Sequence, residues 1–314
     1  MDLKALWSIL KLLIENKSKR KRNRRKSGHN HTTRSDGSLP SWKLIILHRL
    51  LGFEELVFTD HDYVTLQEGR IETHLIKALG RILGMKIYSG AEFSCFLDVG
   101  FLNIEKKILK IHIIGRDFKK DDPEIRDILV YLGERRAHRA TLTLEKISNL
   151  RPELRLPERI KKSKGVITSF DIAKAVCALN SDLDFKNFYR LLIKDDRYRV
   201  PQDSAEAKET IKAINRAGPS VWCHPVRTMK KNFDYFEDVA DILVENGLSG
   251  IEVIGRDQSP EQTLRMIKYC ISRDIRMYAS ADTHIPDNLI QYVKTMDEYG
   301  ENEMFRPYME AIYC

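Results

Sequence analysis

Residues 29–37 read HNHTTRSDG, a stretch that holds two imidazoles and a carboxylate close together. His29 and His31 are separated by one residue, so on an extended chain both side chains project to the same side and can bind one ion. Asp36, in the turn that follows, adds a carboxylate. Two histidines on a strand edge are common, so the stretch predicts a metal site only if further ligands come from elsewhere in the chain.

Short β-rich runs recur after this stretch, at residues 54–60, 86–93, 107–115, 220–225, 249–254 and 275–282. Helical patterns separate most of them, as at residues 42–52 and 68–84. This alternation predicts an α/β fold with parallel strands and crossover helices. Residues 115–219 read almost wholly helical, which predicts a helical insertion. The strand that leads into His29 would form from RRKSG (residues 24–28), which is polar.

Nearly every predicted strand carries a residue of metal-ligand type at or near its end. Because α/β barrels present their working groups at the carboxyl ends of the strands, these side chains should converge. The candidates are six imidazoles and three carboxylates, namely His29, His31, Asp36, His61, Glu92, His112, His224, Asp282 and His284. A set of this size suits three metal ions better than one. The remaining histidines fall in helical runs and are interpreted as structural or surface residues, namely His48, His74 and His138.

Four motifs resemble those of the PHP (polymerase and histidinol phosphatase) superfamily of metal-dependent phosphoesterases. They are HNHTTRSDG, FTDHD (residues 58–62), GAEF (residues 90–93) and SADTH (residues 280–284). The resemblance covers residues 28–288. Three further stretches are similar to the subgroup of RNase AM-type exoribonucleases and nucleoside 3′,5′-bisphosphate phosphatases, namely ERRAHR (residues 134–139), HPVR (residues 224–227) and QSPEQ (residues 258–262).

This resemblance implies a distorted (β/α)7 barrel, the PHP fold, built from residues 27–116 and 208–314 with a helical insertion (cap) domain at residues 117–207. It also implies a trinuclear centre with three subsites: His29, His31, Glu92 and Asp282; Glu92, His112 and His224; and Asp36, His61 and His284. Glu92 and Asp282 would hold a metal-bridging hydroxide. Because imidazoles and carboxylates occur here without thiolates, the expected cofactors are three divalent ions of Mn, Fe or Zn.

The expected activity is hydrolysis of phosphate esters of nucleotides or short RNA, as a 5′-to-3′ exoribonuclease, a 3′,5′-nucleoside bisphosphate phosphatase, or both. Substrate phosphates that do not react need fixed cations, for which the candidates are Arg135, Arg136, Arg139 and Arg227. No general acid is assigned. One alternative is a phosphatase for a small metabolite such as histidinol phosphate. The other is a nucleic-acid-tethered or membrane-tethered protein in which the barrel is structural.

The net charge of +8 comes from one tract, because residues 17–26 (KSKRKRNRRK) hold eight basic residues and no acid. Residues 2–15 have a helical apolar stripe that is too short to span a bilayer. Residues 1–26 are therefore predicted to be an amphipathic helix and basic tail that packs on its own domain, lies on a membrane surface or binds an anionic polymer. Scattered cysteines indicate a cytoplasmic protein, with peripheral membrane attachment as the alternative. No stable protein partner is predicted.

Overall fold

The structure is a computed structural model that describes residues 25–67, 70–100, 102, 107–117, 122–162, 164–256 and 258–313. The predicted N-terminal helix and most of the basic tract lie outside the described residues. Within these ranges, no helix combines the length and the apolar character that crossing a membrane requires.

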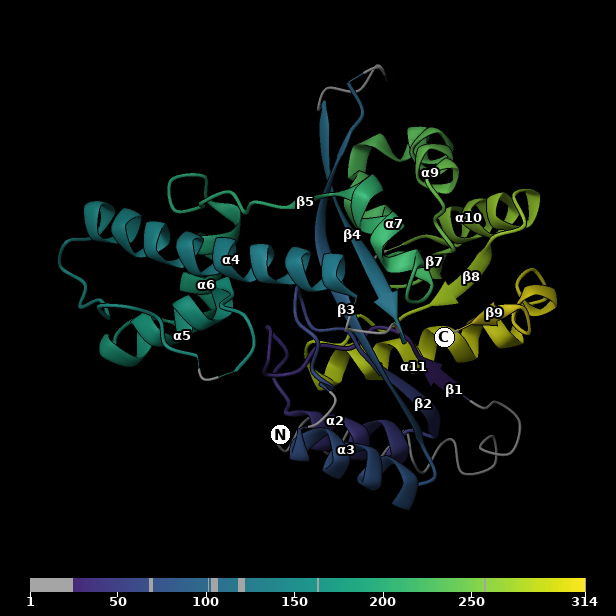
Figure 1. Cartoon of the computed structure of the whole chain (residues 1–314), viewed down its shortest axis with the longest axis horizontal. Coiled ribbons are helices and arrows are strands. Elements are labelled where there is room, and N and C mark those ends of the chain that lie inside the picture. The colour runs from purple at the N-terminus through teal and green to yellow at the C-terminus, as the bar shows by residue number, and fades with distance from the viewer. Residues whose placement is uncertain are drawn as a thin grey trace.

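One sheet organises the body of the molecule (Figure 1), and its strand order is β1-β2-β3-β4-β6-β7-β8-β9, with β5 paired to β3. The strands are β1 (Arg25–Ser27), β2 (Phe53–Phe58), β3 (Lys86–Asp98), β4 (Ile108–Arg116), β5 (Ala205–Glu206), β6 (Ser220–Trp222), β7 (Gly250–Ile254), β8 (Arg276–Ala279) and β9 (Ile312–Tyr313). Beyond β1 and β8, Asn30 and Thr283 form a parallel bridge. The α/β class is therefore confirmed, and the chain segments that follow β1 and β8 lie side by side.

The direction of β4 differs from the parallel pairing that the sequence pattern predicts. This strand runs antiparallel to both β3 and β6. The connection from β3 to β4 covers only residues 99–107, and a parallel crossover needs a dozen residues or more. Glu92 and His112 consequently lie inside paired strands, where Glu92 is opposite Ile114 and His112 is opposite Ser94.

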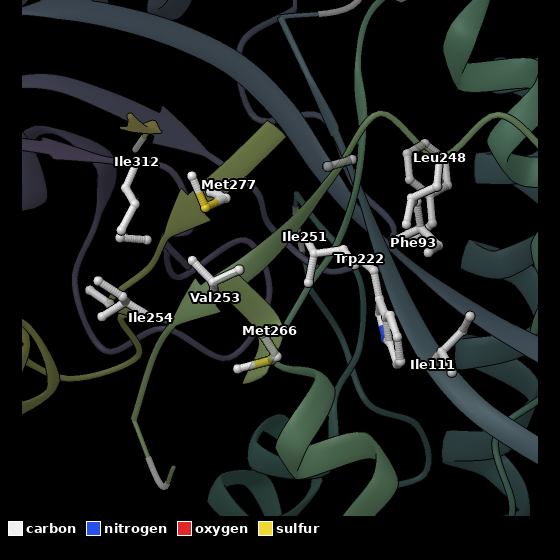
Figure 2. Packing of buried hydrophobic residues seen from close by; sticks show 14 of the residues in the cluster. Phe93, Ile111, Trp222, Leu248, Ile251, Val253, Ile254, Met266, Met277 and Ile312 are labelled. Atoms are coloured by element: carbon white, nitrogen blue, oxygen red, sulfur yellow. The ribbon is translucent and has the colours of Figure 1, made fainter. Parts of the chain in front are cut away.

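Helices cover the sheet, namely α2 (Ser41–Leu50), α3 (Ile71–Ile82), α7 (Ala207–Asn215), α9 (Phe236–Glu245), α10 (Pro260–Ser272) and α11 (Pro286–Glu301). Shorter helical segments are α8 (Pro225–Met229), η1 (Lys230–Tyr235) and η2 (Arg306–Tyr308). Their apolar faces form one large core with the sheet. Figure 2 shows part of it, where Trp222 of β6, Ile251 of β7 and Met266 of α10 are fully buried.

The predicted helical insertion extends to one side of the sheet as α4 (Pro123–Leu150), α5 (Ser169–Leu179) and α6 (Phe185–Lys194) (Figure 1). Asp122 caps α4 by accepting hydrogen bonds from the backbone N–H groups of Glu124 and Ile125. The insertion has an apolar core of its own, which includes Ile147, Ile172, Val176 and Phe188. The domain boundaries proposed from the sequence stay a prediction.

His48 lies on the buried face of α2 and should make stability depend on pH. Burial lowers the pKa of its imidazole from 6.5 to about 4, although Nδ1 lies 2.8 Å from the Leu44 carbonyl oxygen. Because the folded pKa lies below the unfolded value, this contribution is complete above pH 6.5 and is lost as the pH falls towards 4. Lowering the pH from 7.5 to 5 should cost about 2 kcal/mol through this residue.

Urea unfolding of the wild type and of His48→Met at both pH values tests this effect. The difference in unfolding free energy between the two proteins should shrink by about 2 kcal/mol at the lower pH, because the variant has no imidazole to protonate. His74→Gln on the exposed side of α3 is the control and should show no such change. A difference that is constant with pH would contradict the prediction.

Candidate metal centre

The structure brings all nine predicted ligands into one cluster. His29 and His31 follow β1, His61 follows β2, and Glu92 and His112 lie in β3 and β4. The last three come after β6 and β8, namely His224, Asp282 and His284. The fold thus brings together side chains that are far apart in the sequence. Their role as metal ligands remains a prediction from the sequence.

Glu92 is the centre of the cluster. Its carboxylate is fully buried. Its oxygens contact five imidazoles, at 2.6 Å from His112 Nδ1, 2.8 Å from His61 Nδ1, 2.9 Å from His224 Nε2, 3.2 Å from His31 Nε2 and 3.4 Å from His29 Nε2. Such a concentration of nitrogen donors around one buried carboxylate is the arrangement expected of a bridging metal ligand.

Two more carboxylates complete the cluster. Asp36 Oδ1 lies 3.2 Å from His284 Nε2, and Asp36 Oδ2 lies 3.6 Å from His61 Nε2. Asp282 Oδ1 lies 3.3 Å from His284 Nδ1 and 3.4 Å from His31 Nε2. Each carboxylate therefore faces at least two imidazoles.

The ligand-type atoms fall into compact groups whose members lie within 4.8 Å of one another. The groups are His31, Asp36, His61 and His284; Glu92, His112, Cys223 and His224; His29, Cys223 and Glu252; and His29, His31 and Asp282. Three of these closely follow the three subsites that the family resemblance implies. The fourth is built around Glu252, which the sequence reasoning did not select.

Glu252 is the main site residue that the sequence reasoning missed. It lies in β7, is buried, accepts a hydrogen bond of 2.9 Å from the His224 backbone N–H, and lies 3.1 Å from His29 Nδ1. The sequence did contain an indication of this role, because Glu252 is an acidic residue in the apolar strand run SGIEVI. An acid buried in such a strand needs a polar or charged partner. Cys223 is also buried, and its thiol faces Glu92. Burial, reinforced by the Glu92 carboxylate, raises the pKa of this thiol, so it stays protonated.

The backbone is strained at two of the predicted ligands. His224 has a φ of 37° and Asp282 a φ of 44°. Both lie in the left-handed region, which non-glycine residues adopt at a cost and chiefly where the surrounding structure enforces it. This left-handed conformation directs the two side chains into the cluster, just after the carboxyl ends of β6 and β8.

The negative charge of the carboxylates in the cluster favours the binding of cations. Burial opposes ionisation of Glu92, but nearby His61, His112 and His29 outweigh it and hold the pKa of the carboxyl well below its usual range. Burial likewise opposes protonation of His31, yet hydrogen bonds to Asp282 and Glu92 raise its pKa to about 10. The carboxylates therefore remain ionised and attract cations.

The donor atoms also fit a metal ion. Several buried polar atoms in the cluster make no hydrogen bond of good geometry, although most of them lie within 3.2 Å of a polar atom of opposite type, namely Asp36 Oδ1, His61 Nδ1, Glu92 Oε2 and His224 Nδ1. Unpaired buried polar atoms are rare in folded proteins and need an explanation. Coordination of cations supplies one, and mixed imidazole and carboxylate donors suit transition metals.

Two arginines meet one oxygen of Asp282. Arg227 Nη1 lies 2.5 Å from Asp282 Oδ2, and Arg256 Nη2 lies 3.3 Å from the same atom. Arg256 follows β7, much as Arg227 follows β6. The sequence reasoning selected Arg227 but not Arg256. Its Nε is buried and has no hydrogen-bond partner.

The three arginines of the insertion have different surroundings. Arg135 is exposed and lies 3.7 Å from Asp203. Arg136 is buried and lies 2.6 Å from Asp62. Arg139 donates hydrogen bonds to the Val200 carbonyl oxygen and the Ser169 hydroxyl. None of these contacts involves a predicted metal ligand, so of the four predicted phosphate-binding arginines only Arg227 contacts the cluster.

Three curated proteins are similar to this chain over most of its length, while no family model matches it. A 5′-3′ exoribonuclease of Haemophilus influenzae is 24% identical over 279 residues, covering 86% of this chain and 93% of the relative. A phosphoribosyl 1,2-cyclic phosphate 1,2-diphosphodiesterase of Eggerthella lenta is 24% identical, with 82% and 92% covered. The 5′-3′ exoribonuclease Rnm of Salmonella typhimurium is 25% identical, with 82% and 84% covered.

Two solved structures share the fold. A Bifidobacterium adolescentis protein assigned as a metal-dependent phosphoesterase has a TM-score of 0.66 and 20% identity, covering 86% of this chain and 96% of the other. An amidohydrolase from Chromobacterium violaceum with bound sulfate has a TM-score of 0.64 and 19% identity, covering 82% and 87%. The three relatives are named as enzymes that cleave phosphate esters, and the first structure shares the fold, which agrees with the resemblance to phosphoesterases that the four sequence motifs predict.

Proposed function

We propose that this protein is a hydrolase of phosphate esters whose nine predicted ligands hold divalent metal ions. The observation that carries the proposal is the convergence of these ligands into groups within 4.8 Å that correspond to the three subsites. Three ions of Mn, Fe or Zn fit the donor set. When bound, clustered ions neutralise phosphoryl oxygens and lower the pKa of water, which is the chemistry that ester hydrolysis needs.

The protein's own residues have separate tasks in this proposal. Glu92 would contribute to two subsites, because its two oxygens contact imidazoles that belong to different groups. Asp282 holds its orientation through Arg227 and Arg256, which both meet its Oδ2. Glu252 orients His29 through Nδ1 and the turn at His224 through its backbone N–H.

The substrate class that we propose is short RNA or small nucleotides, cleaved as a 5′-to-3′ exoribonuclease or a 3′,5′-nucleoside bisphosphate phosphatase. Support comes from the names of the Haemophilus influenzae and Salmonella typhimurium relatives. A second candidate is hydrolysis of a small cyclic phosphate ester, because the Eggerthella lenta relative is equally similar. Both candidates use the same metal cluster.

The fold that accompanies this function is proposed to be the distorted (β/α)7 barrel, with residues 117–207 as its cap domain. Two observations support closure of the sheet into a barrel. The bridge between Asn30 and Thr283 joins the segments after β1 and β8, and the His31 backbone N–H donates to the Thr283 carbonyl oxygen at 2.9 Å. The separate apolar core of the insertion supports the cap as a domain.

Metal analysis of the purified protein, paired with a Mn-supplemented assay, tests the function. The substrates are a 5′-phosphorylated oligoribonucleotide, a nucleoside 3′,5′-bisphosphate and a ribose cyclic phosphate. We expect bound transition metal and turnover of at least the first or the second. His138→Ala, at an exposed position on α4, is the control and should behave as the wild type. Bound metal without turnover of any of the three would refute the substrate assignment.

Arg227 should act on substrate binding more than on metal content. Its side chain is 42% exposed and its Nη1 lies 2.5 Å from Asp282 Oδ2, so it can reach a substrate phosphate beside the cluster. Truncation by Arg227→Met should raise KM by about tenfold or more, since a charge-assisted hydrogen bond contributes about 1.5–3 kcal/mol. Steady-state kinetics and metal analysis on the same preparation measure both effects. Loss of metal with unchanged KM would contradict this role.

A further inference from the structure

Helices α2 and α3 both expose large apolar side chains to solvent. Six side chains on them are between 37% and 81% exposed, namely Trp42, Ile46, Leu50, Ile71, Leu75 and Ile82. We call these six residues the α2/α3 surface. The two helices pack side by side (Figure 1), and Trp42 and Leu75 line one groove of about 260 Å³ between them. Single exposed apolar residues are ordinary, but a contiguous apolar patch on a protein usually marks an interaction site.

The six side chains form two stripes that follow the helix period. At 3.6 residues per turn, the three on α2 lie within about 80° of arc, and the three on α3 within about 40°. The opposite face of α2 already packs in the core through Leu44, Ile45 and Leu47. Each helix therefore carries a second apolar stripe that the fold itself does not use.

The charges around this surface are basic. Helix periodicity places Arg49 and Lys43 on the two sides of the α2 stripe, and both are exposed. Lys77 and Arg81 add two exposed cations on α3. The acid on these two helices, Glu72, pairs with Arg34 and Lys164. An apolar stripe bordered by cations is typical of helices that lie in the headgroup region of a membrane.

The described end of the basic tract, Arg25 and Lys26, lies in β1 next to the strand that follows α2. Strand β1 pairs with β2 in the register Arg25 to Phe53, and Phe53 follows closely on the end of α2 at Leu50. Of the tract, the structure describes Arg25 and Lys26, which therefore lie near the end of α2 that carries Leu50. Polybasic segments are attracted to anionic lipid surfaces, and their effect adds to that of a neighbouring apolar face.

We propose that the α2/α3 surface docks on an anionic phospholipid bilayer, with Trp42, Leu75 and their neighbours in the headgroup region and the flanking cations against lipid phosphates. Lipid fits better than RNA, because aliphatic side chains gain nothing from a phosphate backbone. It also fits better than a second copy of this chain, because a two-fold contact would place like charges opposite one another. This inference is independent of the proposed function.

Vesicle co-sedimentation with the full chain tests the proposal. Vesicles of phosphatidylcholine and phosphatidylserine should bind the wild type, and vesicles of phosphatidylcholine alone should bind it more weakly. The double substitution Trp42→Asp and Leu75→Asp should lower partitioning to anionic vesicles by roughly tenfold or more, because it places two charges in the apolar surface. Both positions are exposed, so the fold should tolerate the change, which circular dichroism checks.

A matched control carries the same type of change elsewhere. Ile108→Asp together with Ile271→Asp replaces two apolar residues of similar exposure on β4 and α10. This control should bind vesicles as the wild type does. Unchanged vesicle binding by the Trp42 and Leu75 variant would overturn the proposal and assign binding to the basic tail.

Fluorescence gives a second measurement. The chain has three tryptophans, Trp7, Trp42 and Trp222, and Trp222 is fully buried. In a Trp7→Phe chain, anionic vesicles should therefore shift the emission of Trp42 to shorter wavelength. An unshifted emission would contradict insertion. The variant with Trp42→Asp and Leu75→Asp could instead keep lipid binding. If it then lost RNA binding, the occupant of the α2/α3 surface would be RNA, and if it lost a dimer, the occupant would be a second copy of the chain.

Discussion

Replacing Glu92 by glutamine should remove bound metal and hydrolytic activity together, with a fall in activity of roughly three orders of magnitude. The substitution keeps the size of the side chain but deletes a charge that meets five imidazoles between 2.6 and 3.4 Å. Clustered metal ions contribute several kcal/mol to a phosphoryl-transfer transition state, and that contribution disappears with them. Elemental analysis and initial rates on one preparation measure both effects.

Two other glutamate variants are compared with Glu92→Gln, one close to the cluster and one away from it. Glu252→Gln alters a carboxylate that contacts His29 and the backbone of His224, and it should cost about 10-fold to 100-fold in activity or metal affinity. Glu72→Gln on α3 lies away from the cluster and should change neither quantity. Full metal occupancy in an inactive Glu92→Gln protein would argue that Glu92 moves a proton instead of binding the ions.

The sequence predicts which side chains come together better than it predicts the sheet, and the reason is local geometry. His29 and His31 share one side of an extended segment whatever the rest of the fold does, because side chains alternate along a strand. Residues that follow neighbouring parallel strands, such as His31 after β1 and His61 after β2, meet in any α/β arrangement of this kind. The strand assignments therefore account for the convergence of the predicted ligands that follow strands, whereas Glu92 and His112 lie inside the antiparallel pair of β3 and β4.

Strand direction and buried charge could not be predicted with the same rules. The sequence marks β4 as a strand, but its antiparallel direction depends on the length of the 99–107 connection. Glu252 reads as one residue of a strand, and only its neighbours His29 and His224, distant in the chain, show what it does. Both features are set by tertiary contacts that local patterns do not contain.

The ERRAHR stretch shows the same limit on a helix. Charged residues surround α4 at residues 134–139, so periodicity alone cannot tell which of them faces the body of the protein. In the structure, Arg135 is exposed, whereas Arg136 is buried against Asp62. A prediction that treats both as phosphate ligands must therefore be tested residue by residue.

Arg136→Met should lower the free energy of unfolding by roughly 3–5 kcal/mol. The Arg136 side chain is 5% exposed, Asp62 is fully buried, and Arg136 Nε lies 2.6 Å from Asp62 Oδ2. Removing the cation leaves an uncompensated buried carboxylate, which costs more than the pair contributes when intact. The substitution also breaks the 3.2 Å hydrogen bond from Arg136 to the Ser94 hydroxyl, which joins α4 to β3. Urea unfolding measures the change.

Two further variants separate a buried ion pair from a phosphate contact. Arg135→Met, one residue earlier and exposed, should change stability by no more than about 0.5 kcal/mol. Adding Asp62→Asn to Arg136→Met should restore part of the lost stability, because asparagine carries no charge and tolerates the φ of 48° at this position. If Arg136→Met instead raises KM for a 5′-phosphorylated substrate and leaves the unfolding free energy unchanged, Arg136 binds substrate phosphate and the buried pair is dispensable.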